Sequence, residues 1–163
     1  RLLGWPQWAE VLCWPGLLAA VAIWLASLRK LRVMRRPAPL RPLLALHLAP
    51  LALIGTVLVL TGHPGAGQVI AALVGLALLA GVLGARWLTG AGFSALWGAF
   101  AFPVAASADL FWTLYAATPS EALRIIAGVV LVTATLIVIP LTFLILRDWA
   151  RGRLAVKTNA ASA

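Results

Sequence analysis

The sequence predicts an all-α integral membrane protein with five transmembrane helices. Hydrophobic residues make up 63% of the 163 positions and charged residues only 10%, which leaves too little polar surface to cover a water-soluble domain. Five apolar stretches are each long enough for a hydrocarbon core of about 30 Å, which a helix of roughly 20 residues crosses. No Lys or Arg lies in the middle of any of these stretches. We therefore expect a multi-pass membrane protein.

The five predicted helices alternate with short connections. They cover residues 11–28, 43–61, 68–85, 94–116 and 123–146. The remaining segments are an external N-terminal segment at 1–10, a basic cytoplasmic loop at 29–42, an external turn at 62–67, a cytoplasmic loop at 86–93, an external loop at 117–122 and a cytoplasmic tail at 147–163. The external turn contains the motif HPGAG, whose Pro and Gly residues are typical of turns.

The distribution of basic residues predicts the orientation. All of the 13 Lys and Arg residues except Arg1 and Arg124 fall on one side if the five helices alternate in direction. The positive-inside rule makes that side cytoplasmic, so the N-terminus of this chain is external and its C-terminus cytoplasmic, in a bacterial inner membrane. A net charge of +9 confined to one membrane face indicates no nucleic-acid partner. The basic loop is either a plain topology determinant or a patch for lipid headgroups or a partner.

The chain starts in an unusual way for a complete bacterial membrane protein. It begins Arg1-Leu2-Leu3-Gly4, without Met, and its first apolar stretch is too long for a signal peptide. We therefore expect the C-terminal portion of a longer protein. The single cysteine, Cys13, can form no internal disulfide and is read as a packing residue.

Signals for catalysis or for metal binding are nearly absent. Two histidines and one cysteine make no familiar zinc or haem spacing. The sequence also has no dinucleotide-binding or phosphate-binding glycine motif, and no serine beside a plausible base. We expect no cofactor, no metal and no enzymatic activity.

Prolines and two ionisable residues are the features left inside the spans. Pro50, Pro103 and Pro140 lie within the second, fourth and fifth spans, where each removes a backbone hydrogen bond. A carbonyl freed in this way needs protein or water nearby, so these prolines either mark pore-lining helices or simply curve packed ones.

Asp109 is the only acidic residue well inside a span. Charged groups at membrane depth are costly and usually mark a pathway or a pair. Asp109 is read as a lining residue that affects ion choice or proton coupling, or as a carboxylic acid bonded to a neighbouring helix. His47 lies a few residues inside the second span, and histidine is the side-chain type whose charge commonly changes near neutral pH. It is a second candidate lining residue, or a neutral histidine with a satisfied hydrogen bond.

Three segments together resemble one known family. They are LRPLLALHLAPLAL after the basic loop, FSALWGAFAFPVAA, and the leading WPQWAEVLCWPGL. They are similar to the tellurite-resistance and dicarboxylate transporter family, which includes bacterial TehA-like proteins, fungal malate permeases and sulfite exporters, and the slow anion channel of plant guard cells. The resemblance covers the whole chain but only the second half of the family's pattern.

The resemblance implies a fold and an assembly. Members have ten transmembrane helices in five hairpins around a central pore, and they usually form homotrimers. This chain would supply the last five helices, and the missing N-terminal half or a partner chain would supply the rest. The family's alternation of lining and outer helices makes the second and fourth spans, with Pro50 and Pro103, the pore-lining ones.

The resemblance also implies a gate. A phenylalanine in the penultimate helix closes the family's pore, and the pattern Phe100-Ala101-Phe102-Pro103 matches it. Phe102 is the first choice and Phe100 the second; the alternative is a phenylalanine buried between helices. The implied function is an anion channel or transporter that moves small anions through a narrow pore, closed when one aromatic ring excludes water and ions.

Two departures from the family's pattern stand beside this expectation. Asp109 occupies a position where members carry apolar or neutral residues, and a carboxylate there opposes anions unless it is protonated or turned away. In addition, five helices are only part of the family's pore. The competing hypothesis is a non-transporting accessory or scaffolding membrane subunit of a larger complex.

Overall fold

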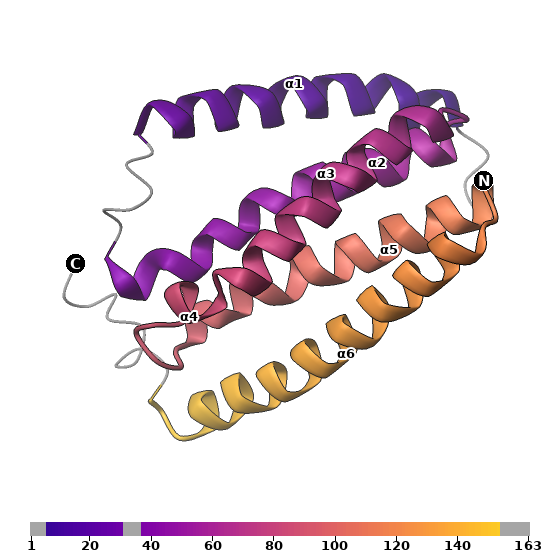
Figure 1. The fold of residues 1–163 in the computed structure, drawn as a ribbon. Coiled ribbons are helices and arrows are strands. Elements are labelled where there is room, and N and C mark those ends of the chain that lie inside the picture. The colour runs from indigo at the N-terminus through magenta and orange to yellow at the C-terminus, as the bar shows by residue number, and fades with distance from the viewer. Residues whose placement is uncertain (1–5, 31–36, 154–163) are drawn as a thin grey trace.

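The computed structural model describes residues 6–30 and 37–153, and within these two stretches every regular element is helical. The elements, shown in Figure 1, are α1 (Pro6–Lys30), η2 (Ala38–His47), α2 (Leu48–Leu60), α3 (Pro64–Leu83), α4 (Ala85–Leu88), η3 (Ala95–Phe100), α5 (Ala101–Ala117) and α6 (Glu121–Ala150). Four helical segments of the described chain are long and apolar enough to cross a membrane: Ala38–Leu60, Pro64–Leu83, Ala95–Ala117 and Glu121–Ala150. The chain is thus an all-helical, multi-pass membrane protein.

The first of the five predicted spans, 11–28, falls within α1. The apolar stretch found in this helix, Trp14–Ile23, is shorter than a full membrane crossing, so the fifth span stays a prediction. Several expectations lie outside the described residues: those for 1–5, for the tail from 154 onward and for the basic residues between 31 and 36. The same holds for the side chain of Cys13.

Two of the four spans change helix type partway across. In each, a 3₁₀ segment (η2 or η3) leads directly into an α-helix (α2 or α5). Pro50 and Pro103 are the third residues of these α-helices, where a backbone N–H has no partner within the helix. This differs from the expected proline kink in a continuous α-helix. The span is interrupted by the change in hydrogen bonding from 3₁₀ to α, and each proline lies in the first α-helical turn, where it is tolerated.

These two interrupted spans repeat the same design. Thr56 and Asp109 are 53 residues apart, and the same spacing separates Pro50 from Pro103 and the last residue of η2 from the last residue of η3. In addition, η2 packs against η3, and α2 packs against α5. Equivalent positions of the two spans therefore lie side by side at the same depth.

The described core lies where α2, α3 and α5 meet. Its largest fully buried members, Leu110, Leu114 and Val74, come from α5 and α3. Close approach at this crossing requires glycine, because a Cβ on Gly55 would lie 2.7 Å from Cγ2 of Ile70 and 2.8 Å from Cδ1 of Leu110.

α1 and α6 lie at the two edges of the helix bundle (Figure 1). α1 packs against α2, and α6 packs against α5 and η3. α6 is largely exposed, and its Pro140 is exposed as well. A proline in this helix therefore does not mark an inner position within this chain, in contrast to the expectation for spans that contain proline.

Candidate functional site

One face of α5 is left uncovered by the described helices. Phe102, Ala105, Asp109 and Trp112 are all exposed, with 56% exposure for Phe102 and 53% for Trp112. Spacings of three and four residues place them on one side of the helix. We call these four residues the α5 stripe. The other side of α5 carries the buried Leu110 and Leu114, so the stripe is the part of this central helix that the described chain does not pack.

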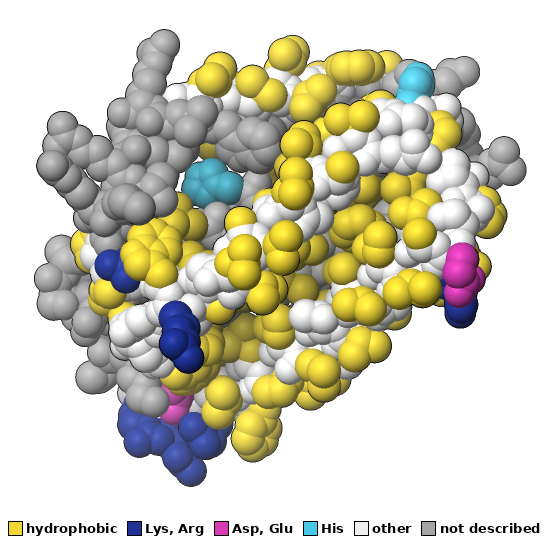
Figure 2. Space-filling view, viewed as in Figure 1, with side chains coloured by type: hydrophobic (Ala, Val, Ile, Leu, Met, Phe, Trp, Pro, Cys, Tyr) yellow, Lys and Arg dark blue, Asp and Glu magenta, His cyan; other side chains and the backbone are white. Residues whose placement is uncertain are grey.

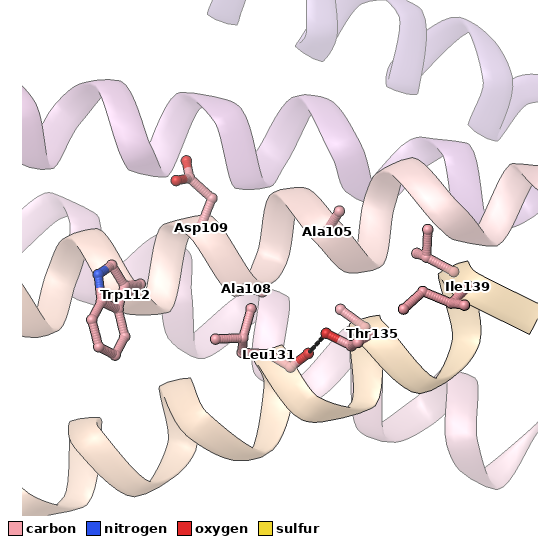
Figure 3. A pocket seen from close by; sticks show the side chains of 9 residues that line it. Ala105, Ala108, Asp109, Trp112, Leu131, Thr135 and Ile139 are labelled. Carbon is pink, nitrogen blue, oxygen red and sulfur yellow. Dashed lines mark hydrogen bonds between the residues drawn. The ribbon is translucent and has the colours of Figure 1, made fainter.

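An open cavity of about 480 Å³ lies beside the stripe, between α5 and α6. Figure 3 shows its lining: Ala105, Ala108, Asp109 and Trp112 come from α5, and Leu131, Thr135 and Ile139 come from α6. Most of these side chains are apolar. Thr135 donates a hydrogen bond from its hydroxyl group to the Leu131 carbonyl at 2.9 Å. Asp109 is the one charged residue among the described residues that line this cavity.

Asp109 has a polar contact with the neighbouring span. The Thr56 hydroxyl of α2 donates a hydrogen bond to Oδ2 of Asp109, with 3.4 Å between the oxygens. Thr56 is only 8% exposed, whereas Asp109 is exposed. In Figure 3 the Asp109 carboxyl projects from α5 on the side away from α6. The carboxylate therefore lies at the α2–α5 contact, with one long hydrogen bond and an open side.

The two candidate gate residues differ in their surroundings. Phe100, at the end of η3, packs edge-on to Trp97 with ring centroids 6.2 Å apart, and Trp97 packs in turn on Phe93. Phe102 is exposed on the same face of α5 as Asp109. The structure thus places Phe102 on the stripe and Phe100 in an aromatic row within the chain.

His47 and the two prolines lie where the 3₁₀ segments meet the α-helices. His47 ends η2, and its Nδ1 lies 3.2 Å from the Leu44 carbonyl, a local contact. Pro103 is fully buried and Pro50 partly buried. Of the six residues expected at the site, Phe102 and Asp109 share the stripe, whereas the other four take part in packing or helix transitions around it.

On the face that Figure 2 shows, the Lys, Arg, Asp and Glu side chains lie at the two ends of the bundle. Hydrophobic side chains cover most of the visible face between them. The basic end comprises Arg41 of η2, which contacts Trp87, the neighbouring Arg86 of α4, and Arg147, Arg151 and Arg153 at or just after the end of α6. At the other end Arg124 pairs with Glu121 on the surface. No group of three or more His, Cys, Asp or Glu residues that could hold a metal ion occurs in the described parts of the chain.

Thr56 does not stand out in the sequence. A threonine in an apolar span is common, because its hydroxyl can bond to a carbonyl one turn back. The signal that could have found it is the repeat, since Thr56 stands 53 positions before Asp109 just as Pro50 stands 53 before Pro103.

Comparisons with protein-family models, with curated proteins and with solved structures found no match for this chain. The class of protein defined by the fold is an all-helical membrane protein with two interrupted spans packed side by side. Any assignment to a particular family rests on the motifs in the sequence.

Proposed function

We propose that this chain forms part of an anion channel or transporter of the tellurite-resistance and dicarboxylate type. In this proposal the interrupted spans η2–α2 and η3–α5 line the path, and α5 presents its stripe to it. The observation that carries the proposal of a path along α5 is a carboxylate, Asp109, exposed near the middle of this membrane helix; the choice of anions as the transported ions rests on the resemblance.

An ionisable side chain at this depth does not favour contact with lipid. Such residues are rare in spans and almost always face a bundle interior or a water-filled cavity. The stripe and the adjoining cavity therefore belong to an aqueous path or to an interface with further protein. The 3₁₀ segments are compatible with both possibilities, because irregular backbone in a membrane is tolerated where it lines a cavity or is covered by protein.

Phe102 is the proposed gate. Its ring is exposed at 56% on the stripe, so it has room to change rotamer, and an aromatic ring in a narrow path excludes water and ions. Phe100 is the second choice. Its edge-on contact with Trp97 favours a fixed position instead.

Selection of anions would come from path width and the cost of dehydration. The sequences of α2, α3 and α5 contain no Lys or Arg, so no cation on these helices would trap an anion. Arginines at the basic end raise the local anion concentration near the mouth. Asp109 acts in the opposite sense, since an anion about 4 Å from an ionised carboxylate is repelled by on the order of 4 kcal/mol at an effective dielectric constant of about 20.

A complete path requires more protein than the described helices. The open side of the stripe would be covered by the missing N-terminal half or by a partner chain, in an assembly that the resemblance implies to be a homotrimer.

The second candidate is an accessory or scaffolding subunit. It is favoured by the same open stripe if a helix of a larger complex packs there and provides a hydrogen-bond donor to Asp109. The two candidates differ in whether the protein itself moves ions.

Ion flux through the full-length gene product in liposomes tests the proposal. Chloride and nitrate gradients should each drive a current or a fluorescence change, whereas matched potassium gradients with an impermeant anion should not. Absence of anion flux from protein that is shown to be folded would favour the accessory subunit.

A further inference from the structure

We propose that Asp109 and Thr56 form a proton-binding site that controls the passage of anions along the α5 stripe. This inference rests on the proposed function and specifies how the path is regulated. In the ionised state the Asp109 carboxylate repels anions. In the protonated state the repulsion is gone and the path conducts.

Asp109 has one described hydrogen-bond partner, Thr56 of α2. The Thr56 hydroxyl donates to Oδ2 of Asp109 at 3.4 Å, from a side chain that is itself only 8% exposed. A single long hydrogen bond of this kind is weak compensation for a charge at membrane depth. Asp109 is exposed, and its carboxyl group points away from α6 (Figure 3), so the carboxyl group is open to water if the α5 stripe faces the proposed path.

No described cation lies where it could neutralise Asp109 instead. α2 and α3, which pack against α5, contain no ionisable residue, and α5 itself adds only Tyr115. On the remaining neighbours the ionisable residues are Arg41 near the start of η2, Glu121 and Arg124 in the first turn of α6, and Arg147 and Asp148 in its last turn. His47 lies farther into the span, at the end of η2, but it precedes Thr56 by nine residues and its described contact is with the Leu44 carbonyl. No ion pair of Asp109 occurs among the described residues.

The matching spacing of the two spans places this site at the contact between α2 and α5. Thr56 and Asp109 occupy equivalent positions of α2 and α5. Their hydrogen bond links the α-helical parts of the two interrupted spans. The less regular 3₁₀ segments precede these parts in each span. The proton comes from water in the path and returns to it, and only an O–H bond of the carboxyl group forms or breaks.

The test is the pH dependence of anion flux through the full-length protein in liposomes. Chloride or nitrate is the probe, because neither changes its charge between acid and neutral pH. We expect wild-type flux to fall as pH rises, by about tenfold for each pH unit above the midpoint, as the protonated fraction of one group does. Asp109→Asn should keep the flux of the acid state at every pH, because its amide is neutral.

Hydroxyl variants provide the matched controls. Thr56→Val removes the described hydrogen bond to Asp109, so the pH profile of its flux should differ from that of the wild type, and Thr56→Ser should restore the wild-type profile. Thr133→Val is the control for loss of a hydroxyl, since Thr133 bonds only to the Val129 carbonyl of its own helix in the described chain; its profile should match that of the wild type.

Infrared difference spectra between acid and alkaline pH give a readout that does not require transport. This chain has four carboxylate side chains, Glu10, Asp109, Glu121 and Asp148. A carbonyl band that titrates in the wild type and is missing in Asp109→Asn assigns proton binding to Asp109.

The outcomes separate this inference from the proposed function. Robust anion flux that does not depend on pH, or Asp109→Asn flux with the wild-type pH dependence, would overturn the proton site and leave the transporter standing. If Asp109→Asn keeps every titrating carbonyl band of the wild type, the proton site is overturned as well. If folded protein carries no anion flux at any pH, both proposals are wrong.

Discussion

The guanidinium group of Arg41 lies over the indole ring of Trp87, with Cζ 4.6 Å from the ring centroid, and its Nη1 donates a hydrogen bond of 3.1 Å to the Trp87 carbonyl. This contact connects η2 with α4, two segments 46 residues apart in the sequence. Both interactions use the planar fork of arginine, which stacks on aromatic rings and donates in plane. The basic end of the bundle therefore has a structural role beside the role in orientation that the sequence predicts.

Replacement of Arg41 should destabilise the protein. Arg41→Ala removes a cation–π contact and a hydrogen bond from a charged donor, together worth about 1–3 kcal/mol. Arg41→Lys should recover only part of this, because an ammonium group does not stack and donate in one plane. Thermal unfolding in detergent measures the difference. The control is Arg86→Ala, an exposed arginine one residue before Trp87, and equal loss in both variants would contradict the assigned role.

The crossing of α2 with α3 and α5 predicts a sharp difference between two glycines. Gly55→Ala should lower the free energy of unfolding by about 1–3 kcal/mol, because the added Cβ would overlap Ile70 and Leu110. Gly81 is the matched control, since nothing lies within 4 Å of a Cβ added there. Gly81→Ala should be neutral or slightly stabilising through better helix propensity. Equal free energies of unfolding of the two variants, measured in denaturant, would contradict the close packing at this helix crossing.

The α5 stripe should react with water-soluble thiol reagents. Ala105→Cys, in a protein whose Cys13 has been replaced, should be labelled in the membrane if the stripe faces a water-filled path. Leu76→Cys is the control, because Leu76 is 65% exposed on α3 and is expected to face lipid, where a charged reagent does not reach a thiol. Mass spectrometry measures the extent of labelling at each of the two cysteines. Failure to label Ala105→Cys, with Leu76→Cys equally unreactive, would favour a stripe covered by protein or lipid.

The membrane class of this chain could be predicted from the sequence because it depends on local properties. An apolar run of the required length indicates a spanning helix regardless of its neighbours, and four long apolar helices in the described chain confirm this class. The place of Asp109 and Phe102 on one face follows in the same way, since residues seven apart share a side of an α-helix.

The interruption of the two spans could not be predicted in the same way. Pro50 and Pro103 indicate a break, but the sequence does not reveal that about half of Ala38–Leu60 is a 3₁₀ segment, because the choice between 3₁₀ and α bonding depends on packing of η2 against η3. Thr56 was missed for a similar reason. Its role exists only because α2 and α5 lie side by side with equivalent positions at one depth.

The proposed anion path depends most on α5, whose Phe102 is the proposed gate. The direct measurement is anion flux through the reconstituted full-length protein with Phe102→Ala beside the wild type, and with Phe143→Ala as the control. Phe143 is 65% exposed on α6, away from the stripe. We predict higher flux for Phe102→Ala than for the wild type and Phe143→Ala, which should match each other. Unchanged flux in Phe102→Ala, or no flux from any of the three folded proteins, would contradict the account.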